Sequence, residues 1–181
     1  MMITATPLAG VYMIDIEPLA DERGFFARTL CEQEFSDAGL QGRFIQHSVS
    51  WNPHAGTLRG LHFQAAPHAE CKLVRVTRGA VFDVVVDMRP QSPDFGKWHA
   101  VELSAYNHRQ LYLPAGIAHG FQTLLPETEV LYAMDSAYHR ASARGVRWND
   151  PALAIDWPAC EDRLISQQDR CWPDLLQDDR L

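Results

Sequence analysis

The sequence predicts an all-β fold, either a sandwich or a barrel of short strands. Runs of β-branched and aromatic residues recur along the middle of the chain, and Gly and Pro separate them. Many short strands at this spacing are typical of sandwiches and barrels. The length of 181 residues lies near the common domain size, so we expect a single domain over residues 1–181.

Turn and helix signals lie between and outside the strand runs. Residues 78–79 have the form of a hairpin turn, and residues 92–96 have that of a longer loop. Helix is expected only at the edges of the domain, over residues 32–38 and in a piece after residues 150–151. The runs expected to form strands are residues 72–77, 80–88, 98–103, 109–113 and 129–134.

Net charge and composition limit the kind of partner. A net charge of −7, without any block of Lys or Arg, argues against a surface for the nucleic-acid backbone. The hydrophobic content of 46% is that of a globular protein rather than of a disordered chain. An anionic ligand must therefore be bound in a local pocket.

Neither export nor membrane insertion is expected. The four cysteines, Cys31, Cys71, Cys160 and Cys171, show no C-x-x-C spacing, and the N-terminal stretch has no charged segment followed by a long apolar run. The apolar stretch 81–86 is too short to span a bilayer. These features favour a reducing cytoplasm and no membrane partner.

Polar side chains stand within several predicted strands. Alternation places His62 and Gln64 on one strand face, opposite their apolar neighbours. Lys72 and Tyr132 likewise project from rows of Val and Met. A base such as His62 and a cation such as Lys72, close to Arg59, are what a carbon-acid reaction on an anionic substrate needs. The alternative for each residue is a buried group satisfied by a hydrogen bond.

Residues 114–121 contain the spacing P-x-G-x-x-H, which resembles the second motif of the cupin jelly rolls. In metal-binding cupins the first motif carries H-x-H followed by a Glu, whereas here Gln64 stands in place of the second histidine. We therefore expect no metal. His62, Glu70 and His119 could still supply three ligands, which leaves a catalytic metal as an alternative.

Nearly the whole chain resembles one cupin branch, the dTDP-4-dehydrorhamnose 3,5-epimerase family. The resemblance implies a cupin-type double-stranded β-helix, or jelly roll, with short peripheral helices. It also implies an enzyme without a metal or cofactor that inverts carbons 3 and 5 of a nucleotide-linked 4-keto-6-deoxyhexose in deoxysugar and rhamnose synthesis. The matching segments are residues 21–26, 56–64, 72–74, 84–89, 92–93, 114–121, 148–151, 155–158 and 165–169.

The resemblance assigns catalytic roles to individual residues. His62 matches the base, and Asp169 matches the carboxylate that orients it. Lys72 matches the cation that stabilises the enolate, with help from His119, and Tyr132 matches the acid on the opposite face. The alternative for Tyr132 is a core tyrosine hydrogen-bonded to the backbone, and the alternative for Lys72 is a lysine at a solvated strand edge.

Further residues match the nucleotide side of the substrate. Arg59 suits the diphosphate because its guanidinium fork fits phosphate oxygens. In the family, residues like Arg23 and Phe26 reach into the neighbouring subunit, which implies a homodimer. Gln46 and Tyr138 match positions that bind or stack on the base. Arg23 could instead form a surface salt bridge, and Tyr138 a core aromatic contact.

Four positions depart from the family pattern on the nucleotide side. Arg28 and Ala143 replace Glu, Ser48 replaces Asn at a substrate-binding position, and Gln168 replaces Lys. Changed polar groups in a binding site alter which base or sugar is tolerated. The sequence therefore leaves open whether one carbon or both are inverted, and whether the sugar is carried by dTDP or by another nucleotide. A 3,4-ketoisomerase and a ligand-binding jelly roll without activity are the competing functions.

Overall fold

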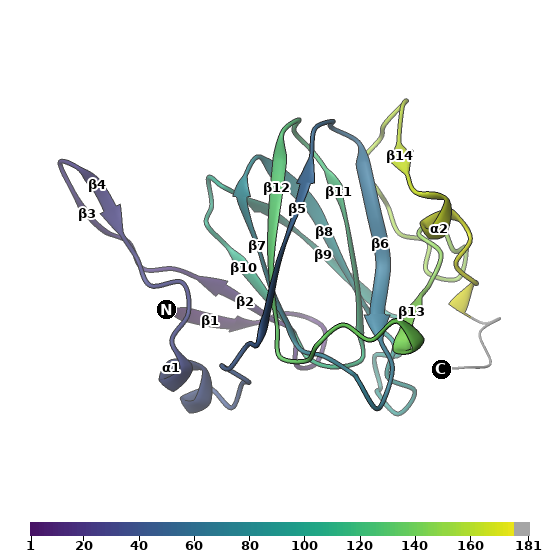
Figure 1. The fold of residues 1–181 in the computed structure, drawn as a ribbon, viewed down its shortest axis with the longest axis horizontal. Helices are drawn as coiled ribbons and strands as arrows, with labels where there is room; N and C mark the ends of the chain where they lie inside the picture. The colour runs from purple at the N-terminus through teal and green to yellow at the C-terminus, as the bar shows by residue number, and fades with distance from the viewer. Residues whose placement is uncertain (176–181) are drawn as a thin grey trace.

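The computed structural model describes residues 1–175, so the last six positions of the expected 1–181 domain lie outside the described residues. Two six-stranded sheets, antiparallel except for the parallel pair β6 and β14, face each other in a jelly roll (Figure 1). One sheet has the order β1 (Met2–Ala5), β2 (Tyr12–Asp15), β10 (Gln110–Leu113), β7 (Lys72–Arg78), β12 (Thr128–Met134) and β5 (Gln46–Asn52). The other has β13 (Ala143–Gly145), β6 (Thr57–Gln64), β11 (Ile117–Thr123), β8 (Ala80–Asp87) and β9 (Trp98–Ser104), with β14 (Leu164–Ile165) pairing β6.

The five expected strand runs are confirmed as β7, β8, β9, β10 and β12, with ends that shift by one residue. The expected hairpin at residues 78–79 is wrong. β7 pairs with β10 and β12, whereas β8 pairs with β9 and β11, so the turn carries the chain from one sheet to the other. Gly79 fits this crossing because its φ is +76°, a value that glycine adopts readily.

The expected helix at residues 32–38 is confirmed as α1 (Glu32–Asp37). The helical piece expected after residues 150–151 does not begin there, because residues 151–153 form a turn. The side chain of Asp150 accepts hydrogen bonds from the backbone N–H groups of Ala152 and Leu175 and so competes with helical bonding. A short helix, α2 (Gln167–Arg170), follows later, and Ser166 caps it. A 3₁₀ turn covers Arg140–Ser142.

Both faces of β8 are buried, which explains its nearly continuous apolar run. Val81 and Val85 pack between the two sheets. Val84 and Val86 pack on the outer side of the second sheet, against Trp157 and other residues of the C-terminal region. By the same alternation Asp83 points between the sheets, into the interior of the jelly roll.

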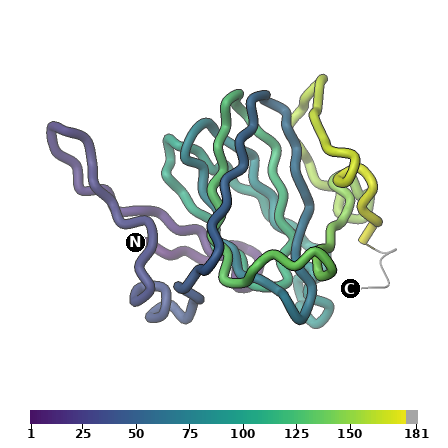
Figure 2. Tube along the Cα trace, viewed as in Figure 1, coloured from purple at the N-terminus to yellow at the C-terminus, as the bar shows by residue number. Residues whose placement is uncertain are grey.

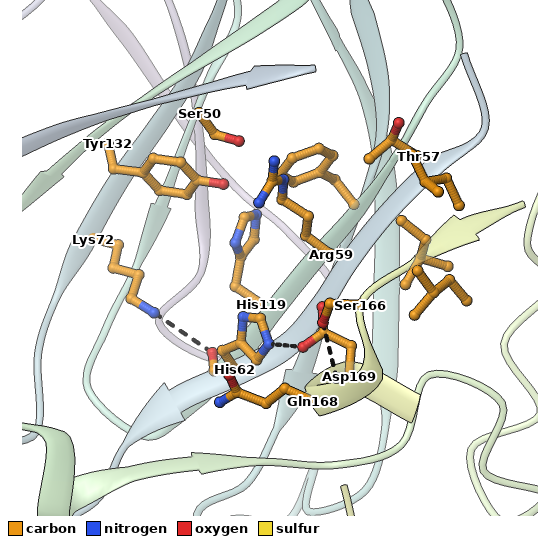
Figure 3. Close-up of a pocket in the computed structure, with 14 residues that line it drawn as sticks. Ser50, Thr57, Arg59, His62, Lys72, His119, Tyr132, Ser166, Gln168 and Asp169 are labelled. Atoms are coloured by element: carbon orange, nitrogen blue, oxygen red, sulfur yellow. Dashed lines mark hydrogen bonds and ion pairs between the residues drawn. The ribbon is translucent and has the colours of Figure 1, made fainter. Parts of the chain in front are cut away.

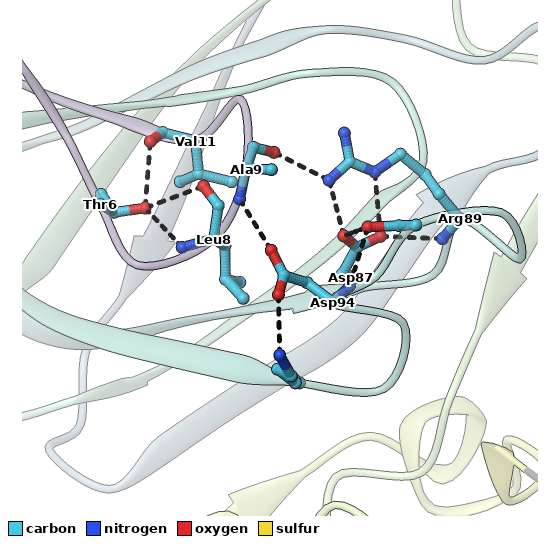
Figure 4. Close-up of polar contacts among 9 residues, drawn as sticks. Thr6, Leu8, Ala9, Val11, Asp87, Arg89 and Asp94 are labelled. Carbon is cyan, nitrogen blue, oxygen red and sulfur yellow. Dashed lines mark hydrogen bonds and ion pairs between the residues drawn. The ribbon is translucent and has the colours of Figure 1, made fainter.

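A buried carboxylate holds the loop between β8 and β9 (Figure 4). Asp87 accepts hydrogen bonds from the backbone and side chain of Arg89 and from Ser92. Arg89 also donates to the carbonyl oxygen of Ala9 at 2.8 Å, and the N–H of Ala9 donates to Asp94. The loop and the N-terminal turn are therefore fixed to each other.

A hairpin of β3 (Leu19–Asp21) and β4 (Gly24–Phe26) projects away from the jelly roll, as Figures 1 and 2 show. Its large apolar side chains Phe25 and Phe26 are exposed. Among residues 1–175, no helix is both long and apolar enough to cross a membrane.

Candidate functional site

A cavity of about 620 Å³ lies between the two sheets and receives side chains from both (Figure 3). β6 and β11 of one sheet contribute Arg59, His62 and His119, and β7 and β12 of the other contribute Lys72 and Tyr132. Asp169 enters from α2. The structure thus brings together all four residues predicted as catalytic, with Arg59 and His119 beside them.

His62 and Asp169 form a hydrogen-bonded pair. Nε2 of His62 lies 2.5 Å from Oδ1 of Asp169, and Figure 3 shows the other ring nitrogen pointing into the cavity. Asp169 also accepts from Trp172 Nε1 at 3.3 Å and from the N–H of Gly60 at 3.4 Å. Burial by itself raises the pKa of Asp169, but the hydrogen bond and charge of His62, together with hydrogen bonds to Gly60 and Ser166, bring it below its ordinary value. Asp169 is therefore held as a carboxylate.

The ammonium group of Lys72 is fixed inside the cavity rather than solvated at a strand edge. It forms an ion pair with Glu70 at 3.0 Å, in which both side chains are mostly buried. It also lies 3.5 Å from the carbonyl oxygen of His62. Gln64 donates to the other oxygen of Glu70 at 2.9 Å and so holds the pair in place.

Tyr132 projects from β12 toward the cavity, across from β6. Burial raises the pKa of its phenol far above the ordinary value; the charge of Asp83 adds to this and that of Arg59 opposes it. The ring of His119 stands edge-on to the Tyr132 ring, with centroids 5.8 Å apart. The phenol therefore keeps its proton until a reacting group removes it.

Asp83 also belongs to the site, although the sequence did not predict it as a site residue. Its Oδ2 lies 2.8 Å from Nε2 of His119, and its side chain is fully buried. Burial raises the pKa of Asp83, although His119 acts in the opposite direction. The signal in the sequence was an acidic residue within the apolar run of β8, on the inward-facing side by alternation.

A second cavity of about 430 Å³ adjoins the first and shares His62, Lys72, Tyr132 and Gln168 with it. Three of the residues predicted to bind substrate lie here, and three of the four positions that depart from the family pattern do so too, Ser48 belonging to both groups. Tyr138 is 61% exposed, so it is not a core aromatic residue. Its N–H donates to Gln46 at 3.0 Å. The residues in question are Gln46, Ser48, Tyr138, Ala143 and Gln168.

The remaining predicted residues lie at the edge of the site or outside it. Arg59 donates through Nε to Asn52 at 2.8 Å. Arg23 and Phe26 lie on the projecting hairpin and line neither cavity; Arg23 pairs with Asp21 on the surface, the alternative considered for it. Arg28 pairs with Glu34 and also lies outside.

The alternative metal site is not formed. In the part of the chain that the structure describes, no three His, Cys, Asp or Glu side chains come together as a metal ion would need. The three proposed ligands instead have separate partners: His62 with Asp169, Glu70 with Lys72, and His119 with Asp83.

Trp172 and Glu70 complete the site and were not predicted in these roles. Trp172 stands edge-on to His62, with ring centroids 6.0 Å apart, and also bonds Asp169. Its place three residues after Asp169, beyond the end of α2, was the available signal. The sequence suggests Glu70 only as a metal ligand, since its position two residues before Lys72 does not reveal that the two side chains meet.

The chain is similar to known proteins along nearly its whole length. Residues 5–177 match the family described as dTDP-4-dehydrorhamnose 3,5-epimerase. The dTDP-4-dehydrorhamnose 3,5-epimerase of Sinorhizobium fredii is 41% identical over 181 residues, which cover 98% of this chain and 91% of the relative. The dTDP-4-dehydrorhamnose 3-epimerase of Streptomyces niveus is 39% identical, covering 87% of this chain and 76% of the relative.

A solved structure agrees with these sequence relatives. The dTDP-6-deoxy-D-glucose-3,5-epimerase of Legionella pneumophila, in complex with dTDP-4-keto-L-rhamnose, superposes with a TM-score of 0.93 at 38% identity. The match covers 98% of this chain and 94% of that one. The chain belongs to the dTDP-4-dehydrorhamnose 3,5-epimerase family.

Proposed function

We propose that this protein inverts C3, C5 or both in a dTDP-linked 4-keto-6-deoxyhexose, a step of deoxysugar and rhamnose synthesis. The observation that carries the proposal is the position of His62 and Tyr132. They project from opposite sheets into one cavity, with the ammonium of Lys72 between the same walls. A base and an acid on opposite sides of one sugar ring are what inversion requires.

His62 begins the reaction as the base. The ketone at C4 acidifies the hydrogens on C3 and C5, so a neutral imidazole can remove one of them. Nε2 is bound to Asp169, which leaves Nδ1 to receive the proton. The carboxylate then stabilises the imidazolium that forms. The electron pair of the broken C–H bond moves into the enolate at C4.

Lys72 and Tyr132 complete the inversion. Negative charge develops on the C4 oxygen, and the preorganised ammonium of Lys72, whose side chain is mostly buried, stabilises it. Tyr132 then donates its phenolic proton to the carbon from the face opposite His62. The phenolate regains a proton from solvent, and His62 releases the one it took, so the enzyme returns to its starting state.

The nucleotide is held by the second cavity and its rim. Gln46, Ser48 and Tyr138 line that cavity and suit the base, and Arg59 suits the diphosphate. His119 contacts the sugar. Arg23 and Phe26 line neither cavity and lie on the hairpin of β3 and β4 that projects from the jelly roll (Figure 1), which supports a homodimer in which this hairpin reaches the partner subunit.

Proton NMR in D₂O with dTDP-4-keto-6-deoxyglucose tests the proposal. His62→Ala should abolish deuterium incorporation at C3 and C5, whereas Tyr132→Phe should allow exchange but hinder inversion. Normal turnover by both variants would refute the assignment. The same spectra test for a ketoisomerase, since migration of the carbonyl to C3 gives a different product.

A further inference from the structure

The active site contains two histidine–carboxylate pairs on neighbouring strands. His62 on β6 and His119 on β11 are register partners, and both line the larger cavity. Each ring binds its carboxylate through Nε2: His62 binds Asp169 at 2.5 Å and His119 binds Asp83 at 2.8 Å. In each ring this leaves Nδ1 for the substrate.

The two carboxylates have opposite surroundings. Asp169 accepts from His62, from the indole of Trp172 and from the N–H of Gly60. Asp83 is fully buried, and among the described residues its Oδ1 has no hydrogen-bond partner. A buried carboxylate with one unsatisfied oxygen is costly, whereas a protonated carboxyl is not. Burial raises the pKa of Asp83, while the pKa of Asp169 is lowered.

The protonation of each carboxyl decides what its histidine can do. An ionised Asp169 accepts Nε2–H from His62 and leaves Nδ1 bare, so His62 is a base. A protonated Asp83 donates to Nε2 of His119, and the ring must then carry its own proton on Nδ1. An ion pair of Asp83 with imidazolium also has a proton on Nδ1. Nδ1 of His119 is bare only when Asp83 is ionised and His119 is neutral. This state places an uncompensated negative charge in the buried pair, which burial disfavours.

We propose that Asp83 holds His119 as a permanent hydrogen-bond donor to the oxyanion of the bound sugar, the reverse of the His62–Asp169 pair; this role rests on the proposed epimerase function. Asp83 is a positioning residue, since among residues 1–175 its side chain hydrogen-bonds only His119 and it lines neither cavity. An uncharged Asp83 also removes a negative charge from the surroundings of Tyr132 and leaves the positive charge of Arg59 there. Both effects favour the phenolate that Tyr132 becomes after it donates its proton.

Two-bond ¹H–¹⁵N NMR on the ligand-free full chain, labelled at histidine, tests the tautomer without turnover. His62→Gln and His119→Gln assign the two rings by loss of their signals. At about pH 8, where an unperturbed histidine is neutral, His119 should carry a proton on Nδ1 and His62 should have a bare Nδ1. A bare Nδ1 on His119 would overturn the proposal, whatever the enzyme's substrate.

Asparagine substitutions supply the kinetic comparison. The side-chain N–H of Asn at position 83 can replace the donor to Nε2 of His119, so Asp83→Asn should lower kcat by less than about tenfold. Asp169→Asn reverses the tautomer of His62 and should lower kcat on the order of 10⁴-fold, as in a hydrolase triad. Equal losses in two folded variants would contradict the donor role. Failure of the wild type to turn over the 4-keto sugar would instead refute the proposed function.

Discussion

Nε2 of His62 lies 2.5 Å from Oδ1 of Asp169, although the two residues are 107 positions apart in the chain. β14 pairs with β6 and brings the C-terminal segment against the strand that carries His62. Ser166 then caps α2 by accepting from the N–H of Asp169 at 3.1 Å, which sets the direction of the carboxylate. The catalytic base therefore depends on how the C-terminal segment docks.

Asp169→Asn should reduce kcat on the order of 10⁴-fold with little change in KM, because the amide reverses the His62 tautomer without changing the shape of the cavity. Steady-state kinetics on the 4-keto sugar measures this. Asp162→Asn, at an exposed position of the preceding turn, is the control and should behave as the wild type. A KM effect alone would assign Asp169 to binding.

Lys72→Met should lower kcat by about 10²–10³-fold, because the oxyanion loses its preorganised cation. Deuterium exchange should slow by the same factor, since enolate formation is the affected step. Lys97→Met is a matched control because Lys97 is exposed and pairs with Asp94 at the surface. Unchanged exchange in Lys72→Met would place the ammonium outside the chemical step.

Tyr138→Ala should weaken binding of the nucleotide by about 1–3 kcal/mol while kcat stays near the wild-type value, as expected for loss of base stacking. The loss of nucleotide affinity is measured by calorimetric titration with dTDP and by the KM of the substrate. Tyr106→Ala removes a tyrosine that is 96% exposed and should change neither quantity. A drop in kcat without weaker dTDP binding would contradict the stacking role.

Gly145→Ala should lower both stability and kcat. A Cβ at this position would lie 2.5 Å from the ring of Trp172, which contacts His62 and Asp169. Such overpacking costs about 1–3 kcal/mol. Urea unfolding and kinetics of Gly145→Ala, Trp172→Ala and the double variant form a double-mutant cycle. Additive effects would show that the two residues are not coupled.

Asp87→Asn should lower the free energy of unfolding by about 1–3 kcal/mol at neutral pH. Burial by itself raises the pKa of Asp87, but hydrogen bonds from Arg89 and Ser92 bring it below its ordinary value. Because the folded pKa is depressed, the carboxylate stabilises the fold above its unfolded pKa of about 3.9, and the effect is lost as pH falls through the folded value.

Urea unfolding of wild type and Asp87→Asn across this acidic range measures the difference. The two should converge as the pH falls below about 4, the unfolded pKa of an aspartate. The exposed Asp156→Asn serves as the control. A constant difference at all pH values would show that the charge of Asp87 contributes nothing.

Local signals predicted five central strands, β7, β8, β9, β10 and β12, to within one residue, but not how they connect. The turn at Gly79 has the same residues whether it closes a hairpin or carries the chain between sheets, so the sequence could not distinguish them. The turn after Asp150 formed because that side chain reaches the N–H of Leu175, a partner distant in sequence. Both errors arise where a contact beyond the local segment decides the conformation.

The sequence by itself determined the strand faces, and with them that Lys72 and Tyr132 point inward, because side chains alternate along every strand. Family motifs added His62 and Asp169. Only the tertiary structure decided that Asp83 lies beside His119 and that Glu70 holds Lys72. The physical reason is that a carboxyl's protonation depends on its burial and on the donors around it, and these come from strands and helices that folding alone brings together.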